Sequence, residues 1–461
     1  MRRMSRLLLL VAVGTVALVV SPAGASAEHS TRPHTQNMHA LGHSPNPASF
    51  LVDPPGPAPS PVNSDLAFWG KVVFNGNYDG FRIIKGSPGN PKLINWTRCQ
   101  GNQGDIVVWG NFLVRAWNSP AVAGATCDGQ PVPTGFEGMH IFDISNLEDP
   151  VLVGEVELSA RPQADSPGCG THTLTLVPDP ANNRAIIYNA TSGGNMLLPP
   201  ADQNCDWIDI IQVPLSNPGA ASHVRREPLE GGHAAHDNGV ILGDVNKLAT
   251  ASGHMSNVFD IGNEGGSLTD PKFLYTIEEP GVCNTGGPLC NGNWHSAAFS
   301  WDGDVIILGW EPGGGAAPEC EASDPDVKKS AFFYDADDGS KLGQWTLPRP
   351  QSAAENCTIH NYNVVPLRSG RRILVSGNYQ AGTWVTDFTN PGAAQTLGWS
   401  DPPPLVPTQL GGAWSSYWYN NFIWESSITE GLNVFRFADK ATAGAIRLPH
   451  LNPQTQEFSL P

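Results

Sequence analysis

Histidine is the residue type whose placement in this chain could support chemistry. Four histidines each stand at the head of a short strand-like run, at similar intervals along the chain: His172, His236, His295 and His360. Imidazole nitrogens are common ligands of zinc, copper and iron, so four of them on one rigid surface would form a metal site. Glu311 and Glu425 end strand-like runs and could add carboxylate ligands to this set.

Histidines in such positions can also be structural. One ring nitrogen can bond an Asp or Asn of the same strand, as the pairs His236-Asp237 and His360-Asn361 suggest, and the other can bond a backbone carbonyl of a neighbouring sheet. A buried hydrogen bond of this kind is worth about 1 kcal/mol net and requires no metal. A third interpretation gives the histidines a pH-sensitive or substrate-contacting role. The sequence leaves all three open.

Recognised catalytic motifs are absent from the sequence. It has no Gly-x-Ser-x-Gly elbow, no His-Glu-x-x-His pair and no phosphate-binding glycine loop. Two functional hypotheses follow. In the first, the protein is an extracellular binding or scaffold protein with a metal site at one end of a central channel. In the second, it is a metal-dependent enzyme of the oxidoreductase type, which uses a zinc, copper or iron ion held by the histidines; no catalytic residue is assigned.

A recurring pattern of strand-like runs predicts the fold. Each copy is an aromatic and β-branched run that ends in Asp or a turn, preceded by two apolar runs that a tight turn joins. An Asp-Gly turn between apolar runs, as at residues 301–304, is a hairpin signal. The seven copies are residues 81–85, 139–144, 207–211, 257–261, 331–335, 382–388 and 431–435.

Each unit therefore predicts a four-stranded meander. The units begin near Asp65, Asp105, His172, His236, His295, His360 and Ala413. A lone sheet exposes both faces, whereas sheets stacked around an axis bury them. We expect an all-β fold, a seven-bladed β-propeller of four-stranded antiparallel blades. The first strand of each blade would line the channel, so the four histidines would gather at one mouth, with Glu311 beside His295.

In these runs the chain resembles the LVIVD-repeat family of secreted β-propellers. The signature is a hydrophobic run followed by Asp-(Ile)-Ser/Thr-Asn-x-x-(Asp)-Pro. It matches closely at residues 139–154, fairly at 81–94 and 382–391, and loosely elsewhere. The resemblance covers nearly the whole chain after its first residues. It implies a propeller architecture and no particular reaction.

The last unit lacks a fourth strand, and the N-terminal part of the chain offers one. Residues 38–43 echo the fourth-strand pattern of residues 151–155. We expect this segment to complete the last blade, because closing the ring removes two open strand edges. The predicted organisation is a leader over 1–27, the closing strand and a Pro-rich connector over 28–62, the propeller over 63–440 and a C-terminal tail over 441–461.

The first 27 residues have the pattern of a signal peptide. Arg2, Arg3 and Arg6 precede an apolar run at residues 7–20, and a small-residue cleavage site follows at residues 25–27. No later run is long enough to cross a membrane as a helix. The formal net charge of −17 argues against nucleic acid as a partner. We expect a secreted monomer whose partner is an extracellular protein, a peptide or a small molecule.

Eight cysteines in an exported chain favour disulfides over metal binding. Spacing alone supports only the short loop between Cys283 and Cys290. Pairing of neighbours along the chain would add Cys99–Cys127, Cys169–Cys205 and Cys320–Cys357, although other pairings remain open.

Overall fold

The computed structural model describes residues 31–47, 62–158, 169–191, 205–231, 234–279, 292–312, 315, 317–405 and 410–461. The predicted leader and the Cys283–Cys290 pair lie outside these ranges. No helix in the described ranges is long and apolar enough to cross a membrane.

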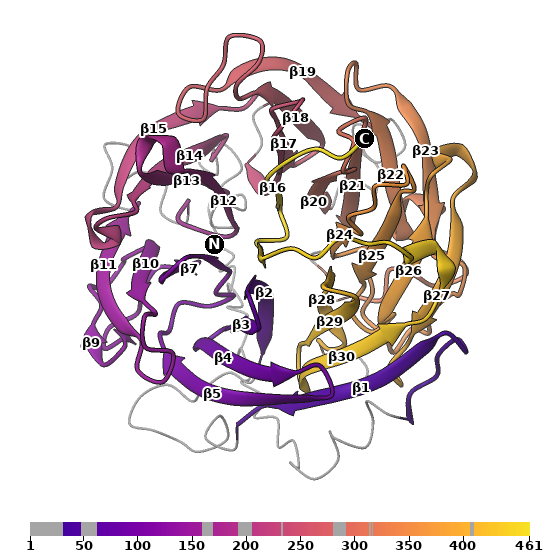
Figure 1. Ribbon diagram of the computed structural model, residues 1–461, viewed down its shortest axis with the longest axis horizontal. Helices are drawn as coiled ribbons and strands as arrows, with labels where there is room; N and C mark the ends of the chain where they lie inside the picture. The colour runs from indigo at the N-terminus through magenta and orange to yellow at the C-terminus, as the bar shows by residue number, and fades with distance from the viewer. Residues whose placement is uncertain are drawn as a thin grey trace, which may run out of the picture.

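The described residues form an all-β fold with a propeller-like arrangement. Figure 1 shows the sheets set around a central axis, with β2, β12, β16, β20, β24 and β28 nearest to it and β5, β11, β15, β19, β23, β27 and β1 at the rim. Five sheets are separate blades of four or five strands, and one sheet has eight strands. The apolar cores lie between neighbouring sheets; for example, one core joins Phe74 and Ile83 of the first blade to Leu113 and Phe142 of the second.

The strands of the five blades run outward from the axis in chain order. They are β2 (Asn63–Trp69), β3 (Val72–Asn77), β4 (Gly80–Ser87) and β5 (Asn90–Arg98); β6 (Ile106–Trp109), β7 (Phe112–Trp117), β10 (Gly138–Asp143) and β11 (Val151–Glu157); β12 (Leu174–Asp179), β13 (Arg184–Asn189), β14 (Trp207–Pro214) and β15 (Ser222–Pro228); β16 (Ala235–Ile241), β17 (Lys247–Ser252), β18 (Met255–Asp260) and β19 (Lys272–Glu278); and β20 (Gly292–Phe299), β21 (Val305–Pro312), β22 (Ser330–Asp335) and β23 (Lys341–Thr346).

The eight-stranded sheet corrects the prediction of seven separate blades. It combines β24 (Asn361–Val364), β25 (Ile373–Gly377), β26 (Thr383–Asp387) and β27 (Gln395–Ser400) with β28 (Ala413–Tyr419), β29 (Phe422–Ser427), β30 (Gly431–Phe437) and β1 (Met38–Pro45). The two groups of four are joined because the inner strands β24 and β28 share one parallel pair, Asn361 and Ser415. Close approach of inner strands near the axis therefore merges what the sequence pattern predicts as two sheets.

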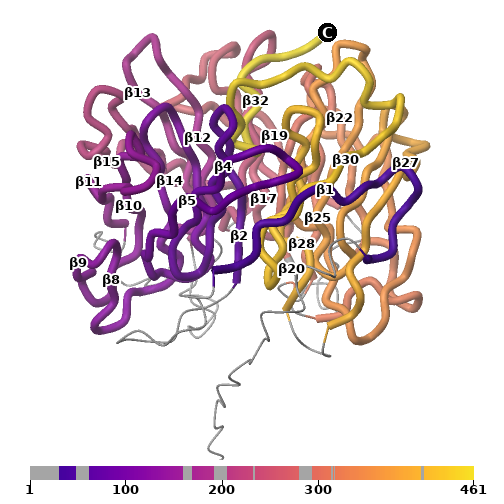
Figure 2. Tube along the Cα trace, turned by 60° about the horizontal axis from the view of Figure 1, so that its bottom comes forward, coloured from indigo at the N-terminus to yellow at the C-terminus, as the bar shows by residue number. Residues whose placement is uncertain are grey.

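The N-terminal strand closes the ring as predicted. β1 pairs antiparallel with β30, from Met38 opposite Phe437 to Pro45 opposite Gly431. Figure 2 shows β1 at the rim, alongside β30 of the eight-stranded sheet and next to the first strands of the chain. Both ends of the propeller thus share one sheet.

Every outer strand carries the same irregularity. In β1, β5, β11, β15, β19, β23 and β27, the register shifts so that one residue of the outer strand is left unpaired. Those residues are Leu41, Ile94, Val153, Val224, Leu274, Leu342 and Leu397. At Gly343, just after one such bulge, a Cβ would lie 2.1 Å from the carbonyl oxygen of Pro391 in the next turn. The bulge and the glycine let the turn of the adjacent four-stranded unit pack against the outer strand.

The C-terminal segment crosses the axis, where the sequence predicted a tail. β31 (His450–Leu451) pairs with the far end of β2, and β32 (Thr455–Gln456) pairs in parallel with the far end of β16. Between them Asn452 exchanges two hydrogen bonds with the backbone of Val108. Figure 1 shows this segment running across the centre. One face of the propeller is therefore crossed by the chain itself.

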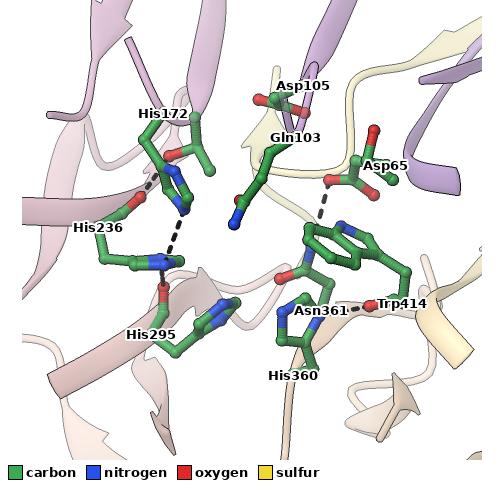
Figure 3. Close-up of a pocket in the computed structure, with 11 residues that line it drawn as sticks. Asp65, Gln103, Asp105, His172, His236, His295, His360, Asn361 and Trp414 are labelled. Carbon is green, nitrogen blue, oxygen red and sulfur yellow. Dashed lines mark hydrogen bonds between the residues drawn. The ribbon is translucent and has the colours of Figure 1, made fainter. Parts of the chain in front are cut away.

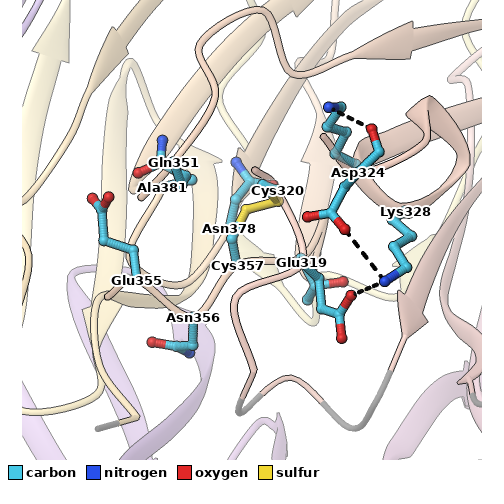
Figure 4. Close-up of a disulfide and its surroundings, with 12 residues drawn as sticks. Glu319, Cys320, Asp324, Lys328, Gln351, Glu355, Asn356, Cys357, Asn378 and Ala381 are labelled. Atoms are coloured by element: carbon cyan, nitrogen blue, oxygen red, sulfur yellow. Dashed lines mark hydrogen bonds and ion pairs between the residues drawn. A yellow bond between two sulfur atoms is a disulfide. The ribbon is translucent and has the colours of Figure 1, made fainter. Parts of the chain in front are cut away.

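Three disulfides are present among the described cysteines, and all three follow the neighbour pairing: Cys99–Cys127, Cys169–Cys205 and Cys320–Cys357. Figure 4 shows Cys320–Cys357 close to the ion pairs of Lys328 with Glu319 and Asp324. The remaining short elements are the hairpin β8 (Thr126–Cys127) and β9 (Gln130–Pro131) and the 3-10 turns η2 (Pro180–Asn182), η4 (Pro218–Ala220), η7 (Asp326–Lys329), η8 (Pro391–Ala393) and η9 (Lys440–Thr442).

Candidate metal centre

The four predicted histidines lie together beside the axis, on the face where the inner strands begin (Figure 3). Consecutive imidazole rings from His172 to His360 have centroids 4.2, 4.0 and 3.9 Å apart. His236 and His295 sit at register shifts of β16 and β20, where pairing with the next strand skips the histidine. A bulge re-aims a side chain out of the normal alternation, and here it brings both imidazoles into the cluster.

Two of these imidazoles have a fixed tautomer, because one nitrogen of each faces a backbone carbonyl. The Nδ1 atom of His236 lies 3.0 Å from the carbonyl oxygen of His295, and that of His360 lies 2.5 Å from the carbonyl oxygen of Trp414. A carbonyl oxygen only accepts hydrogen bonds. Both Nδ1 atoms therefore carry a proton and donate it.

The other two histidines are oriented in the same way. The Nδ1 atom of His295 lies 2.6 Å from the Ser296 hydroxyl, which itself donates to the carbonyl oxygen of His360 and so is free to accept from the imidazole. The Nδ1 atom of His172 lies 2.8 Å from the side-chain oxygen of Asn118 and donates to it. In all four residues, Nδ1–H is committed to an oxygen.

The Nε2 atoms are consequently lone-pair acceptors in the neutral rings. Those of His172 and His236 face each other at 2.8 Å. The Nε2 atom of His360 is buried and has no hydrogen-bond partner among the described residues. Two facing lone pairs repel, whereas two ligands at a right angle on one metal ion, with bonds of 2.0–2.1 Å, lie about 2.9 Å apart. The pair therefore accommodates either a proton on one ring, in an N–H···N hydrogen bond, or a metal ion that both nitrogens bind.

Burial keeps these histidines neutral. Loss of hydration lowers the pKa of His236 to about 4 and that of His360 to about 3. The pKa values of His172 and His295 fall well below the usual range for the same reason, and the neighbouring imidazoles lower them further. Neutral imidazole is the form that binds metals.

Carboxylates and a very small cavity adjoin the imidazoles. A cavity of about 10 Å³, roughly the space of one water molecule, is lined by all four histidines and by Asp65, Asp105 and Gln103 among others. No Lys or Arg belongs to the lining that the structure describes. Burial raises the pKa of Asp65, and burial together with the nearby Asp65 and Asp237 raises that of Asp105. These carboxyl groups lack a cationic partner in the lining.

Glu311 lies where the sequence placed it. Its Oε2 atom is 3.8 Å from Nε2 of His295, and its Oε1 atom accepts a hydrogen bond of 3.1 Å from the Tyr379 hydroxyl. Ligand atoms of His236, His295 and Glu311 all lie within 4.8 Å of one another. A second cavity, of about 80 Å³, is bounded by these three residues together with His360, Tyr379 and Trp414, among others. Glu311 can therefore supply an oxygen ligand at the edge of the cluster.

Glu425 does not join the site, although the sequence grouped it with the histidines. Its carboxylate binds Arg32, which lies just before β1, with an N–O distance of 3.0 Å. In the sequence, Asp65 and Asp105 were named only as starts of repeat units and Asp237 only as a neighbour of His236, and none of them was grouped with the site. Aligning the repeat units would have done so, since each lies near the start of the inner strand of its unit, next to the position that histidine takes in other units.

Comparison with known proteins adds no family. No protein-family model matches the chain, and no curated protein matches it. Among solved structures, the computationally designed Ika8 protein is 12% identical, with a TM-score of 0.44 over 81% of this chain and 96% of that chain. A protein from Lactobacillus plantarum is 12% identical (TM-score 0.46, 73% and 84% covered), and Raptor from Chaetomium thermophilum is 10% identical (TM-score 0.49, 82% and 28% covered).

Proposed function

We propose that this protein is a metal-binding propeller that holds one transition-metal ion beside its axis. The ligands are the Nε2 atoms of His172, His236, His295 and His360, with Glu311 as an oxygen ligand. One observation carries the proposal: every Nδ1–H is committed to an oxygen, while the Nε2 atoms of His172 and His236 lie 2.8 Å apart and ligand atoms of His236, His295 and Glu311 all lie within 4.8 Å of one another. Metal-binding histidines typically donate their other ring N–H in this way.

A purely structural role for the histidines explains only one of the two nitrogens in each ring. It explains the Nδ1 hydrogen bonds to Asn118, Ser296 and the backbone. It leaves the lone pair on Nε2 of His360 buried without a donor among the described residues. An unsatisfied buried polar group costs about 1–3 kcal/mol, which a bound cation would offset.

The donor set and its angles favour copper(II). Imidazole and carboxylate ligands without thiolate suit copper, zinc and iron alike. A tetrahedral zinc ion would hold two imidazole nitrogens about 3.3 Å apart, and a right angle would hold them about 2.9 Å apart. The 2.8 Å separation between His172 and His236 is nearer the right-angle value, so copper(II), which prefers square-planar or tetragonal sites, is the ion to test first.

An oxidoreductase activity is the second candidate, and the larger cavity favours it. The space of about 80 Å³ beside His236, His295 and Glu311 would let a small molecule reach an open position on the ion. An ion enclosed on all sides would serve only binding or structure.

We further infer that the eight-stranded sheet represents two blades, giving seven in all. Seven outer strands share one bulge, and a turn beginning Asn-Pro packs on the glycine after it in the best-matched copies. The repeated Asp closes that turn, as where Asp387 accepts from the backbone nitrogen of Thr389 at 2.9 Å. These recurrences support LVIVD-type repeats. Three disulfides support secretion, with an extracellular protein, peptide or small molecule as partner.

Metal analysis tests the proposal directly. The purified protein, stripped with a chelator and titrated with copper(II), should bind one equivalent, and electron paramagnetic resonance should show nitrogen ligands. The double variant His236→Ala plus His295→Ala should lose at least a hundredfold in copper affinity and remain folded. The exposed pair His34→Ala plus His39→Ala is the matched control. Equal copper affinity in both double variants would reject the proposal.

A further inference from the structure

A second cluster of metal-ligating side chains lies away from the axis, at the Cys99–Cys127 disulfide. His140, in β10, packs against this disulfide, and the two sulfur atoms and an imidazole nitrogen lie within 4.8 Å of one another. All three side chains are fully buried. The cluster does not share a residue with the candidate copper centre.

His140 differs from the axial histidines in its hydrogen bonding. Neither of its ring nitrogens has a hydrogen-bond partner among the described residues. The rings of Trp117 and Phe136 enclose it at centroid distances of 5.3 and 4.9 Å. A carboxylate oxygen of the half-exposed Glu155 lies 3.5 Å from Nε2. A fully buried imidazole with two unsatisfied nitrogens is costly, so a role beyond packing would explain it.

We propose that, once the Cys99–Cys127 disulfide is reduced, Cys99, Cys127 and His140 bind a zinc ion. A dithiol reductant supplies two electrons and two protons to the disulfide and becomes a disulfide itself. The zinc ion then displaces the two thiol protons and binds both thiolates. Reoxidation by a disulfide reforms the Cys99–Cys127 bond and releases the ion.

Forming the site requires modest movements of the side chains. Zinc bonds of about 2.3 Å to sulfur and 2.0–2.1 Å to nitrogen place sulfur and nitrogen ligands about 3.6 Å apart in a tetrahedron, and two sulfur ligands about 3.8 Å apart. The imidazole nitrogen, within 4.8 Å of both sulfurs, therefore approaches by about 1 Å, and the two sulfurs separate once their bond is reduced. Two thiolates and one imidazole supply three of the four ligands that zinc prefers, and a water molecule can take the fourth position.

The position of the disulfide gives the site a structural consequence. Cys99 directly follows β5, and a few residues further on Gln103 and Asp105 line the axial cavity. The backbone nitrogen of Thr126, beside Cys127, donates to the side chain of Gln100 at 2.9 Å. The cysteine pair thus adjoins a segment that borders the candidate metal centre.

Cobalt(II) substitution tests the proposal, because a thiolate ligand gives cobalt a charge-transfer band that an imidazole site cannot produce. The full chain, reduced with a phosphine under native conditions, should develop this band with one equivalent of cobalt and lose it on adding zinc. Cys99→Ser plus Cys127→Ser should abolish the band. His140→Phe, which keeps both thiols, should weaken zinc binding by at least about a hundredfold, since losing even an outer partner of a ligand costs 10–100-fold.

Two controls separate this site from other thiols and from the axial histidines. Cys169→Ser plus Cys205→Ser removes a pair that has no third ligand nearby in the described residues and should keep the band. His236→Ala plus His295→Ala should also keep it, so the two proposals fail independently. Unchanged zinc affinity in His140→Phe would overturn the proposal. A second result would also overturn it. In that result, zinc does not stabilise the reduced protein against unfolding, although the variant Cys99→Ser plus Cys127→Ser, which lacks both thiols, stays folded.

Discussion

Buried carboxylates occur in two regions of this molecule, and the two regions differ in the charge of the groups around them. At the ring closure, Glu425 and Glu430 both bind Arg32 at N–O distances of 3.0 Å, and Asn433 donates to both carboxylates at 2.8 Å. At the axis, Asp65 and Asp105 share a cavity whose described lining has no basic residue. The first region pairs its carboxylates with a cation of the chain, whereas the second provides neutral donors, such as Tyr417 and Gln454 for Asp65.

The pKa values record this difference. Burial alone would raise the pKa of Glu425, but Arg32 and the hydrogen bonds from Asn433 and Thr383 outweigh burial and lower it. The pKa values of Asp65 and Asp105 are raised, because burial dominates there. A buried charge is retained where a partner offsets its lost hydration. The contrast shows that the closure holds its carboxylates with a cation of the chain, whereas the carboxyl groups at the axis have no basic residue in the described lining.

The largest effect expected from this comparison is at Arg32. Replacing it in Arg32→Met leaves Glu425 and Glu430 buried without their cation, and breaking a buried pair in this way costs about 3–5 kcal/mol. Guanidinium denaturation at neutral pH would measure the loss in the free energy of unfolding. Arg436→Met, at an exposed position in β30, is the control and should change stability by less than about 0.5 kcal/mol.

Copper binding at the axis should raise the free energy of unfolding, and this increase should not depend on the ion pairs at the ring closure. At a free copper concentration 100 times the dissociation constant, binding adds about 2.7 kcal/mol to the free energy of unfolding. The same increment is expected in Arg32→Met, since separate sites usually contribute additively, and none in His236→Ala plus His295→Ala. Thermal melts with and without copper would show this. A smaller increment in Arg32→Met would mean that the two regions are coupled.

Acid should remove the stabilisation that the pairing of Glu425 with Arg32 gives to the fold at the ring closure. A carboxyl group with a lowered folded pKa stabilises the fold above its unfolded pKa, about 4.3 for Glu, and the stabilisation disappears as the pH falls through the folded value. The stability gap between wild type and Arg32→Met should therefore be largest at neutral pH and narrow below about pH 4.3. Urea denaturation across this range gives the gap, and a constant gap would show that Arg32 acts through packing alone.

The sequence was sufficient for the parts of the molecule that repeat. Local alternation and turn residues predicted the strands, and the echo between residues 38–43 and 151–155 predicted the pairing of β1 with β30. The position of His295 at a strand head and of Glu311 at the end of the next strand predicted their approach, because a hairpin fixes that register. These inferences need only short-range geometry and a repeated unit.

The parts that do not repeat escaped prediction. Arg32 and Glu425 are 393 residues apart, and no pattern in either neighbourhood indicates the other. The C-terminal segment has no repeat signature, so its strands β31 and β32 were not foreseen, and the parallel contact of β24 with β28 depends on how inner strands converge at the axis. The protonation of each imidazole depends on atoms such as the Ser296 hydroxyl, which only the folded structure positions.

The smallest expected effect tests whether the axial carboxylates resemble Glu425 after all. Gln454, in the segment that crosses the axis, donates to Oδ2 of Asp65 at 2.9 Å, and the Tyr417 hydroxyl donates to the same oxygen at 2.8 Å. Gln454→Leu removes one neutral hydrogen bond and should cost about 1 kcal/mol in copper-free protein, measured by guanidinium denaturation. The Tyr417 hydroxyl remains as a donor to Asp65 and limits the loss. A loss as large as that of Arg32→Met would instead mean that Asp65 depends on Gln454 as strongly as Glu425 depends on Arg32, so that the two regions stabilise their carboxylates to the same degree.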